Sequence, residues 1–171
     1  TDPILSFFKL ITRIAEKFSL KTRIRQRHPR FNLFVYGVLM NKEILAERLR
    51  MTIDEINKEF RFRKAVLKGW KRIANVYSYT YQGYVFNLCK DEKSSVEGIL
   101  ISGLTYEDLL RLDQYEIPYT REEVSVFCNE RPVKAFVYVY KEKMHAKPGE
   151  VSSKYLKLVQ KAAEEWNIKL P

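Results

Sequence analysis

Glu116 is the side chain in this sequence with the best prospect of doing chemistry. The stretch from Ser102 to Val126 predicts an apolar-periodic helix that ends on Leu112-Asp113-Gln114-Tyr115-Glu116, and a strand-like alternation follows almost at once. A single carboxylate at a helix end, where the chain turns over a sheet or barrel, can accept a proton if burial tunes its pKa. On this segment alone a solvated surface Glu is the commoner case. Residues elsewhere must decide between the two.

A glycine turn earlier in the chain is the second feature that could contribute to a site. Residues 31–35 (FNLFV) form a short apolar run that predicts a buried strand, and Tyr36-Gly37 follows it directly. Gly37 lacks a Cβ, so a ligand can approach the backbone closely there. Tyr36 by itself would fit equally well as an aromatic side chain that closes the core.

The elements around these two features predict an α+β domain. Residues 39–49 and 52–62 predict helices, and 62–88 predict several strands separated at Gly69 and Gly83. Residues 91–95 read as a polar turn, 96–104 as a strand, and Thr105 as the cap of the helix that ends on Glu116. Strands over 119–127 and 132–140 and a last helix from Ser152-Ser153 complete the pattern. Many short strands punctuated by glycine would suit a twisted mixed sheet that curls towards a barrel.

Composition and charge divide the chain into two parts. With 46% hydrophobic and 30% charged residues in a chain of 171, we expect one soluble globular domain, and no apolar run is long enough to span a bilayer. Residues 1–30 hold eight Lys or Arg against two acids, which is +6 of the total net charge of +10. We therefore separate residues 1–30, an amphipathic helix and basic connector, from a domain over residues 31–171. Two widely spaced cysteines are expected to be free thiols, which points to the cytoplasm.

The N-terminal segment predicts an amphipathic helix whose apolar stripe runs over residues 4–18. Asp2-Pro3 provides its start, and residues 21–30 read as an extended basic connector. The favoured interpretation is that this stripe packs on the barrel or on a second subunit, because a stripe so continuous needs a cover. An anionic membrane surface, peripheral to which the protein would then lie, is the open alternative. The arginines of residues 23–30 could contact phosphates, but no specific nucleic acid partner is expected.

Several motifs together, in their order and spacing, resemble the γ-glutamylcyclotransferase-like family, which includes the plant AIG2-like proteins and the γ-glutamylamine cyclotransferases. The motifs are Phe34 to Leu39 (FVYGVL), Leu67 to Trp70 (LKGW), Val96 to Leu100 (VEGIL), Leu112 to Glu116 (LDQYE) with Tyr119-Thr120-Arg121 behind it, and Ser153 to Leu156 (SKYL). The resemblance covers about residues 31 to 165. It implies a small mixed β-barrel flanked by helices, to which this chain adds its N-terminal helix.

The resemblance also implies a function and its residues. Glu116 would be the catalytic acid–base, and Tyr36, Gly37, Val38 and Leu39 would form the substrate-binding loop of an enzyme that releases 5-oxoproline and an amine from a small-molecule γ-glutamyl compound. Tyr119 and Arg121 are candidates for the cavity rim. No cofactor and no metal are implied.

Two positions depart from the family pattern. Val38 replaces the usual Ser of the turn, and Ile117 replaces the usual Gly after the catalytic Glu. These departures leave a second reading open, a non-catalytic small-molecule binding module on the same fold.

Overall fold

The structure, a computed structural model, describes residues 2–27 and 29–171, and the side chains of these residues apart from 16–27. Five strands close into a barrel in the order β1-β3-β2-β4-β5. They are β1 (Phe31–Val35), β2 (Arg61–Ser78), β3 (Gly83–Leu104), β4 (Thr120–Cys128) and β5 (Arg131–Val139). All neighbours pair antiparallel except β1 and β5, which close the barrel in parallel at Leu33 and Phe136. The α+β class and the barrel expected from the sequence are therefore confirmed.

The two long strands β2 and β3 form most of the barrel wall, and here the sequence reading of short strands was wrong. Gly69 does not end a strand. It takes a φ of 84°, and the pairing passes from Lys68 opposite Ser95 to Trp70 opposite Lys90. Residues 91–94 are therefore extra residues in β3 opposite the single Gly69, and they form an irregularity within the strand where a turn was predicted. The polar signal was local, whereas the cross-strand pairing on both sides of it keeps the ladder continuous.

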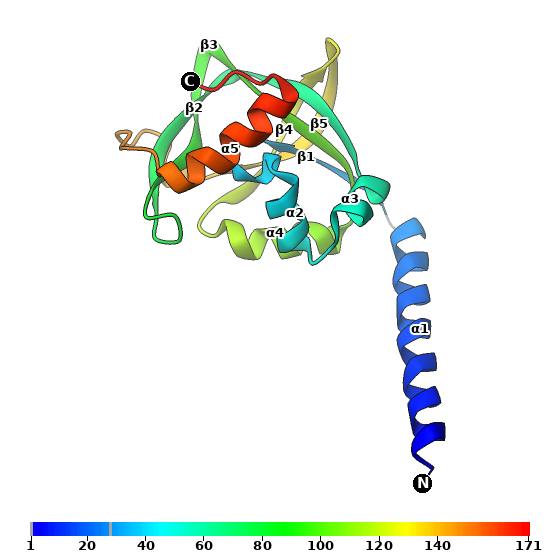
Figure 1. The fold of residues 1–171 in the computed structure, drawn as a ribbon. Helices are drawn as coiled ribbons and strands as arrows, with labels where there is room; N and C mark the ends of the chain where they lie inside the picture. The colour runs from blue at the N-terminus through cyan, green and yellow to red at the C-terminus, as the bar shows by residue number, and fades with distance from the viewer. Residues whose placement is uncertain (1, 28) are drawn as a thin grey trace.

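Four helices and two short 3-10 turns accompany the strands. They are η1 (Val38–Met40), α2 (Lys42–Leu49), α3 (Ile53–Glu59), α4 (Tyr106–Glu116), η2 (Lys141–Lys143) and α5 (Ser153–Trp166). Figure 1 shows α5 across one side of the barrel, with α2 and α4 lying together below it. The helix expected over 39–49 starts later, because Asn41 caps α2 by accepting from the N–H groups of Glu43 and Ile44 at 3.1 and 3.4 Å.

The barrel interior and the undersides of the helices form one apolar core. Fully buried side chains come from β1, β3, α2, α4 and α5, among them Leu33, Phe34, Leu45, Leu100, Leu109 and Val159. The helices contribute apolar residues at 3.6-residue spacing and the strands at 2-residue spacing, because each element turns its apolar face inward. The packed core fixes the ends of β1 and α4, and those two ends carry the candidate site.

The N-terminal helix α1 (Pro3–Arg27) does not pack on the barrel as expected from the sequence. It extends away from the other elements (Figure 1), and its large apolar side chains between residues 4 and 14 are exposed, Phe7 by 60% and Phe8 by 62%. The connector predicted to be extended from Lys21 is helical up to Arg27, because the helical pattern continues through the basic residues. His28 and the side chain of Phe18 lie outside the described residues. Among the helices described, none is both long enough and apolar enough to cross a membrane.

Candidate functional site

Glu116 is held at the end of α4 by the packing and capping of that helix. The Thr105 hydroxyl accepts from the N–H of Asp108 at 3.1 Å, and the Asp108 carboxylate accepts from the N–H of Thr105 at 2.9 Å. Leu109 and Leu112 are fully buried and anchor the helix on the core. The Glu116 side chain, at the opposite end of the helix, is 15% exposed. It is therefore a largely buried acid, not the solvated one that the local sequence would favour.

The bend after β1, residues 36–39, is held in place by contacts with other elements. The Tyr36 hydroxyl donates to the carbonyl of Tyr138 at 2.5 Å, which ties the bend to β5. Gly37 lies against the Tyr155 hydroxyl so closely that an added Cβ would collide with it. A larger residue at this position would force the bend or Tyr155 to shift, so glycine permits the close approach of another side chain to the backbone.

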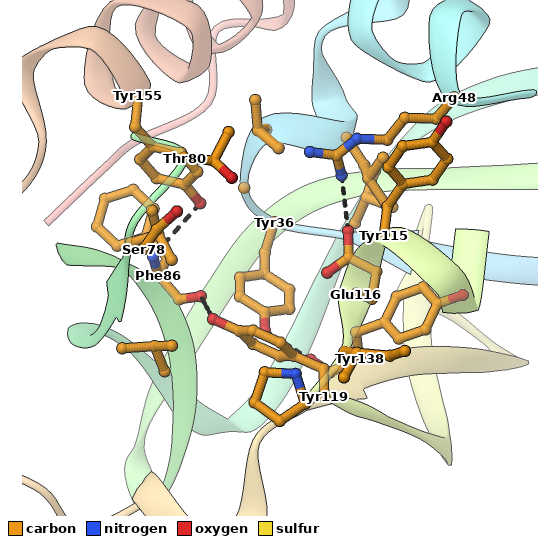
Figure 2. A pocket seen from close by; sticks show the side chains of 18 of the residues that line it. Tyr36, Arg48, Ser78, Thr80, Phe86, Tyr115, Glu116, Tyr119, Tyr138 and Tyr155 are labelled. Atoms are coloured by element: carbon orange, nitrogen blue, oxygen red, sulfur yellow. Dashed lines mark hydrogen bonds and ion pairs between the residues drawn. The ribbon is translucent and has the colours of Figure 1, made fainter. Parts of the chain in front are cut away.

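The bend and Glu116 line the same cavity, whose volume is about 420 Å³. Figure 2 shows Glu116 on one side of it, Tyr155 and Phe86 on the other, and the ring of Tyr36 between them. The lining comes from β1 and the bend after it, from β2 and the turn after it, from β3, from α2, from the end of α4 and the residues after it, from β5 and from α5. In chain order the residues are Phe34, Val35, Tyr36, Gly37, Val38, Leu39, Arg48, Val76, Tyr77, Ser78, Tyr79, Thr80, Val85, Phe86, Tyr115, Glu116, Ile117, Pro118, Tyr119, Tyr138 and Tyr155.

Arg48, which the sequence reading did not single out, is the partner of Glu116. Its Nη1 lies 2.9 Å from Oε1 of Glu116, and the dashed line between them in Figure 2 marks this ion pair. Nη2 donates to the Tyr81 hydroxyl at 3.4 Å, and the guanidinium lies 5.5 Å from the centre of the Tyr115 ring. Arg48 belongs to α2, so the pair joins two helices that are far apart in the sequence.

Opposing influences act on the pKa of Glu116. Burial is the largest and raises the pKa, and the nearby charge of Asp113 raises it further. The charge of Arg48 and its hydrogen bond lower it. The net direction is upward from the ordinary value of a Glu, because desolvation outweighs the ion pair. A carboxylate whose pKa is raised in this way is better matched to proton transfer near neutral pH than an exposed Glu.

Tyrosine hydroxyls form the opposite wall of the cavity. The Tyr155 hydroxyl accepts from the N–H of Phe86 at 3.3 Å. The Tyr119 hydroxyl donates to the carbonyl of Phe86 at 2.8 Å. Burial raises the pKa of Tyr36, Tyr119 and Tyr155 well above that of a free phenol, so these hydroxyls keep their protons at neutral pH.

Arg72 supports the bend from behind. Its guanidinium donates to the carbonyl of Tyr36 at 2.9 Å, to that of Glu97 at 2.6 Å and to that of Lys169 at 3.3 Å. Burial lowers the pKa of Arg72 to about 10, so it remains charged at neutral pH. Three backbone carbonyls from distant segments are thereby held on one cation. This role could not be predicted from a sequence motif, because a backbone carbonyl can accept a hydrogen bond whatever its residue type.

The two residues expected at the cavity rim, Tyr119 and Arg121, do not both line the cavity. Tyr119 lines the cavity and also a second hollow beside it, whereas Arg121 lines only the second hollow. Its Nε lies 2.7 Å from Oδ1 of Asp113, and its guanidinium lies 5.1 Å from the centre of the Phe136 ring. Of the two departures from the family pattern, Val38 is buried in the bend and Ile117 is 77% exposed at the cavity mouth.

Metal ligation was not expected from the sequence. Within the residues that the structure describes, no group of three or more His, Cys, Asp or Glu side chains could hold a metal ion. The polar groups that line the cavity are one carboxylate, one guanidinium, several phenols, the hydroxyls of Ser78 and Thr80, and the backbone of the bend.

Comparison with protein families gives one match over most of the chain. The family model described as "Gamma-glutamyl cyclotransferase, AIG2-like" matches residues 33–164, which include the bend, α4 and α5. No curated protein sequence matches the chain.

Solved structures share the fold at low sequence identity. A structure described as "Gamma-glutamyl cyclotransferase" has a TM-score of 0.67 and 20% identity, covering 80% of both chains. A protein from Homo sapiens, described as uncharacterized, has a TM-score of 0.68 and 20% identity, covering 82% of both chains. A yeast γ-glutamyl cyclotransferase described as specific to glutathione has a TM-score of 0.56 and 13% identity, covering 82% of this chain and 89% of its own. At these identities the likeness shows the barrel fold alone.

Proposed function

Because this chain belongs to the γ-glutamyl cyclotransferase, AIG2-like family, we propose that it releases 5-oxoproline and an amine from a γ-glutamyl amide. The observation that carries the proposal is that Glu116 and the bend of Tyr36, Gly37, Val38 and Leu39 line one cavity. Its volume of about 420 Å³ lies within the range of roughly 300–1,000 Å³ that proteins use for small-molecule ligands. A glutamyl group fits such a space with part of its leaving group outside.

The reaction moves two protons from the α-ammonium to the leaving amine and closes one ring. Glu116 removes a proton from the α-ammonium, and the freed amine attacks the carbonyl carbon of its own side-chain amide. A C–N bond forms, the carbonyl oxygen takes the negative charge, and the attacking nitrogen keeps one proton too many. Glu116 returns its proton to the leaving nitrogen, and the C=O bond re-forms as the bond to that nitrogen breaks. The ring nitrogen gives its extra proton to the released amine, which departs as an ammonium. One carboxylate thus acts first as base and then as acid. Since the nucleophile belongs to the substrate, holding it in a near-attack geometry supplies much of the rate, and neither cofactor nor metal is required.

Tyr155 supports this chemistry from the opposite wall. A hydroxyl has one proton to donate and two lone pairs, and the hydrogen bond described for Tyr155, from the N–H of Phe86, uses a lone pair. Its proton is therefore available for an oxygen of the substrate. We assign to Tyr155 a hydrogen bond to the developing oxyanion, a task that the absent Ser hydroxyl at position 38 cannot perform. Tyr119 would contact the substrate from the cavity wall, while Arg121 has no part in this proposal.

The experiment is a screen of γ-glutamyl amides for release of 5-oxoproline, repeated with Glu116→Gln. The variant keeps the size of the side chain and removes its ability to accept a proton, so turnover should fall by about 100-fold or more. Glu123→Gln, a change at an exposed residue of β4, is the matched control and should retain wild-type turnover. Full activity in Glu116→Gln would refute the assignment of this residue.

A second candidate function, a non-catalytic small-molecule binding module, is favoured by one specific observation. The acid already has a cationic partner at 2.9 Å, and a paired carboxylate is a weaker base than a free one. In that case γ-glutamyl amides would bind to the purified protein, measured by calorimetry, without release of 5-oxoproline.

For residues 4–18 we propose an anionic membrane surface as the partner. The exposed apolar side chains of residues 4–14 have no cover from the barrel, and residues 1–30 carry a net charge of +6. A basic helix with exposed phenylalanines suits the boundary of an anionic bilayer. The full chain should co-sediment with anionic vesicles at low salt and be released by high salt, and Phe7→Glu with Phe8→Glu should abolish this. Equal sedimentation of both proteins would overturn the proposal, and a dimer lost in the double variant would assign the helix to self-association instead.

We also propose that the protein is cytoplasmic. Both Cys89 and Cys128 are free thiols, and free thiols persist in reducing compartments. A fractionation experiment in the source cells that recovers the protein only from an oxidising compartment would contradict it.

A further inference from the structure

The charges of the cavity form a matched pair. Among the described residues that line it, Arg48 is the one cation and Glu116 the one anion. Their side chains are 14% and 15% exposed, so each charge has lost most of its water. A pair of this kind contributes little net stability, because desolvating two ions offsets most of their attraction. Its position inside the cavity suggests a role in binding.

The placement of Arg48 follows from the bend itself. Asn41 ends the bend and caps α2, and Leu45 and Leu49 bury the inner face of that helix in the core. Arg48, next to Leu49, is therefore carried over the cavity towards α4. The bend and the guanidinium belong to one continuous segment, so they keep a constant relation to each other.

Arg48 has hydrogen-bonding capacity left for a ligand. A guanidinium has five N–H donors in a planar fork. The contacts described use one donor for Glu116 and one for the Tyr81 hydroxyl, the latter long at 3.4 Å. The ring of Tyr115 lies against the guanidinium at 5.5 Å and limits its movement without occupying its donors. A planar fork with free donors is suited to a carboxylate.

We propose that Arg48 binds the α-carboxylate of the γ-glutamyl group, so that Arg48 and Glu116 together recognise the charged α-amino acid head of the substrate. This inference rests on the proposed function. In an amino acid head the ammonium and the carboxylate are attached to one carbon, and in the cavity their two counterparts lie 2.9 Å apart. With the ammonium on Glu116, one orientation of the α-carbon sets the carboxylate against the neighbouring guanidinium.

The leaving amine would lie at the mouth of the cavity, away from Arg48 and Glu116. The exposed side chains that line the cavity are uncharged: Tyr77 is 50%, Tyr79 90% and Ile117 77% exposed, and Thr80 is exposed as well. These side chains carry no charge with which to bind a carboxylate on the leaving amine. Substrate selection by charge therefore acts on the glutamyl end, and the rim gives contact area to the leaving amine.

Binding also changes the state of the acid. Without substrate, Arg48 lowers the pKa of Glu116 against the effect of burial. Once the guanidinium shares its charge with the α-carboxylate, that lowering weakens, and Glu116 becomes a stronger base beside the ammonium that it must deprotonate.

The test compares substrates with and without the α-carboxylate. A γ-glutamyl amide is paired with the 4-aminobutanoyl amide of the same amine, which cyclises to 2-pyrrolidinone. Wild-type protein should prefer the γ-glutamyl compound in kcat/KM. Arg48→Gln should lower kcat/KM for that compound by about 10- to 100-fold, the range for loss of charge-assisted hydrogen bonds, and should change that for the 4-aminobutanoyl compound much less. Arg48→Lys should restore part of the preference.

Arg50→Gln is the matched control, since Arg50 is exposed, lies two residues away at the C-cap of α2, and does not line the cavity. It should keep the preference unchanged. If Arg48→Gln retains the wild-type preference between the two amides, the inference is wrong even though the enzyme works.

A binding measurement separates this inference from the proposed function. Calorimetry with 5-oxoproline, which keeps the carboxylate, and 2-pyrrolidinone, which lacks it, needs no turnover. Binding of 5-oxoproline that is lost in Arg48→Gln and kept in Arg50→Gln supports the role of Arg48, even in a protein that releases no 5-oxoproline from any amide. Equal binding to wild type and Arg48→Gln, or no binding to wild type, overturns it.

Discussion

Two arginines stand close to the same bend, and they differ in how their donors are used. Arg72 lies behind the bend, is 6% exposed, and gives its donors to three backbone carbonyls. Arg48 lies on the cavity side and makes one short contact, to Glu116, and one long contact, to Tyr81. A cation whose donors are satisfied by backbone is part of the framework. A cation with donors to spare beside a cavity is suited to a ligand.

The largest effect on stability is expected when Arg72 is removed. Arg72→Met would remove the donor from the carbonyls of Tyr36, Glu97 and Lys169, that is, from one buried and two partly buried hydrogen bonds. Each unsatisfied buried group costs about 1–3 kcal/mol, so the free energy of unfolding should fall by about 3 kcal/mol or more. Arg48→Met leaves Glu116 buried without its cation, but the acid can take up a proton, so at about pH 5 the loss should be smaller than that in Arg72→Met. Urea denaturation of both variants measures the difference, and equal losses would remove the distinction between the two arginines.

Gly37→Ala tests whether the bend is as tightly packed as the framework residues suggest. The added Cβ would collide with the Tyr155 hydroxyl, so either the bend or α5 must move. Overpacking of this kind costs about 1–3 kcal/mol of stability. Release of 5-oxoproline should fall more steeply than stability does, because Tyr155 and the bend are both assigned to substrate binding. A variant with unaltered melting temperature and activity would contradict the packing described for the bend.

Tyr155→Phe sharpens the comparison on the cavity side. Loss of the hydroxyl removes a donor for the oxyanion and leaves the ring in place, and we expect kcat to fall by about 10- to 100-fold with little change in KM. Tyr119→Phe, which removes a hydroxyl that donates to the carbonyl of Phe86, should lower kcat less and stability more. Steady-state kinetics of both variants decides, and the reverse order of effects would assign the oxyanion contact to Tyr119.

The smallest effect concerns pH. Glu116 must be ionised to act as a base, so activity rises as the pH passes its pKa. Arg48 lowers that pKa, and the charge of Asp113 raises it. In Arg48→Gln the acid limb of the kcat/KM profile should therefore move to higher pH. An acid limb that stays in place would show that Arg48 does not act on the ionisation of Glu116.

Glu116 also links folding to pH. Burial raises its pKa in the folded protein above the unfolded value, so its contribution to stability is fully present below the unfolded pKa and is lost as the pH rises through the folded pKa. Glu116→Gln resembles the neutral form. Its stability relative to wild type should therefore be more favourable at pH 7.5 than at pH 4, as denaturation at the two pH values would show.

Much of the framework could be predicted from local patterns. The apolar run of β1, the cap at Thr105, the end of α4 at Glu116 and the start of α5 near Ser152 all follow from signals within a few residues of each feature. The same reasoning failed at residues 91–95 and at Gly69. There the turn signals were present, but pairing along the rest of β2 and β3 outweighed them.

The sequence by itself determined the candidate acid, the glycine bend and the family, because these depend on residue types at short spacing. Only the tertiary structure decided which groups surround the acid. Arg48 and Glu116 are 68 residues apart, and Tyr155, Tyr138 and Arg72 reach the bend from three other elements. It also decided that Arg121 lines another hollow and that the large apolar side chains between residues 4 and 14 of α1 are uncovered by the barrel. The physical reason is that an ion pair or a buried hydrogen bond depends on which residues are close in three dimensions. Closure of the barrel brings those distant residues together.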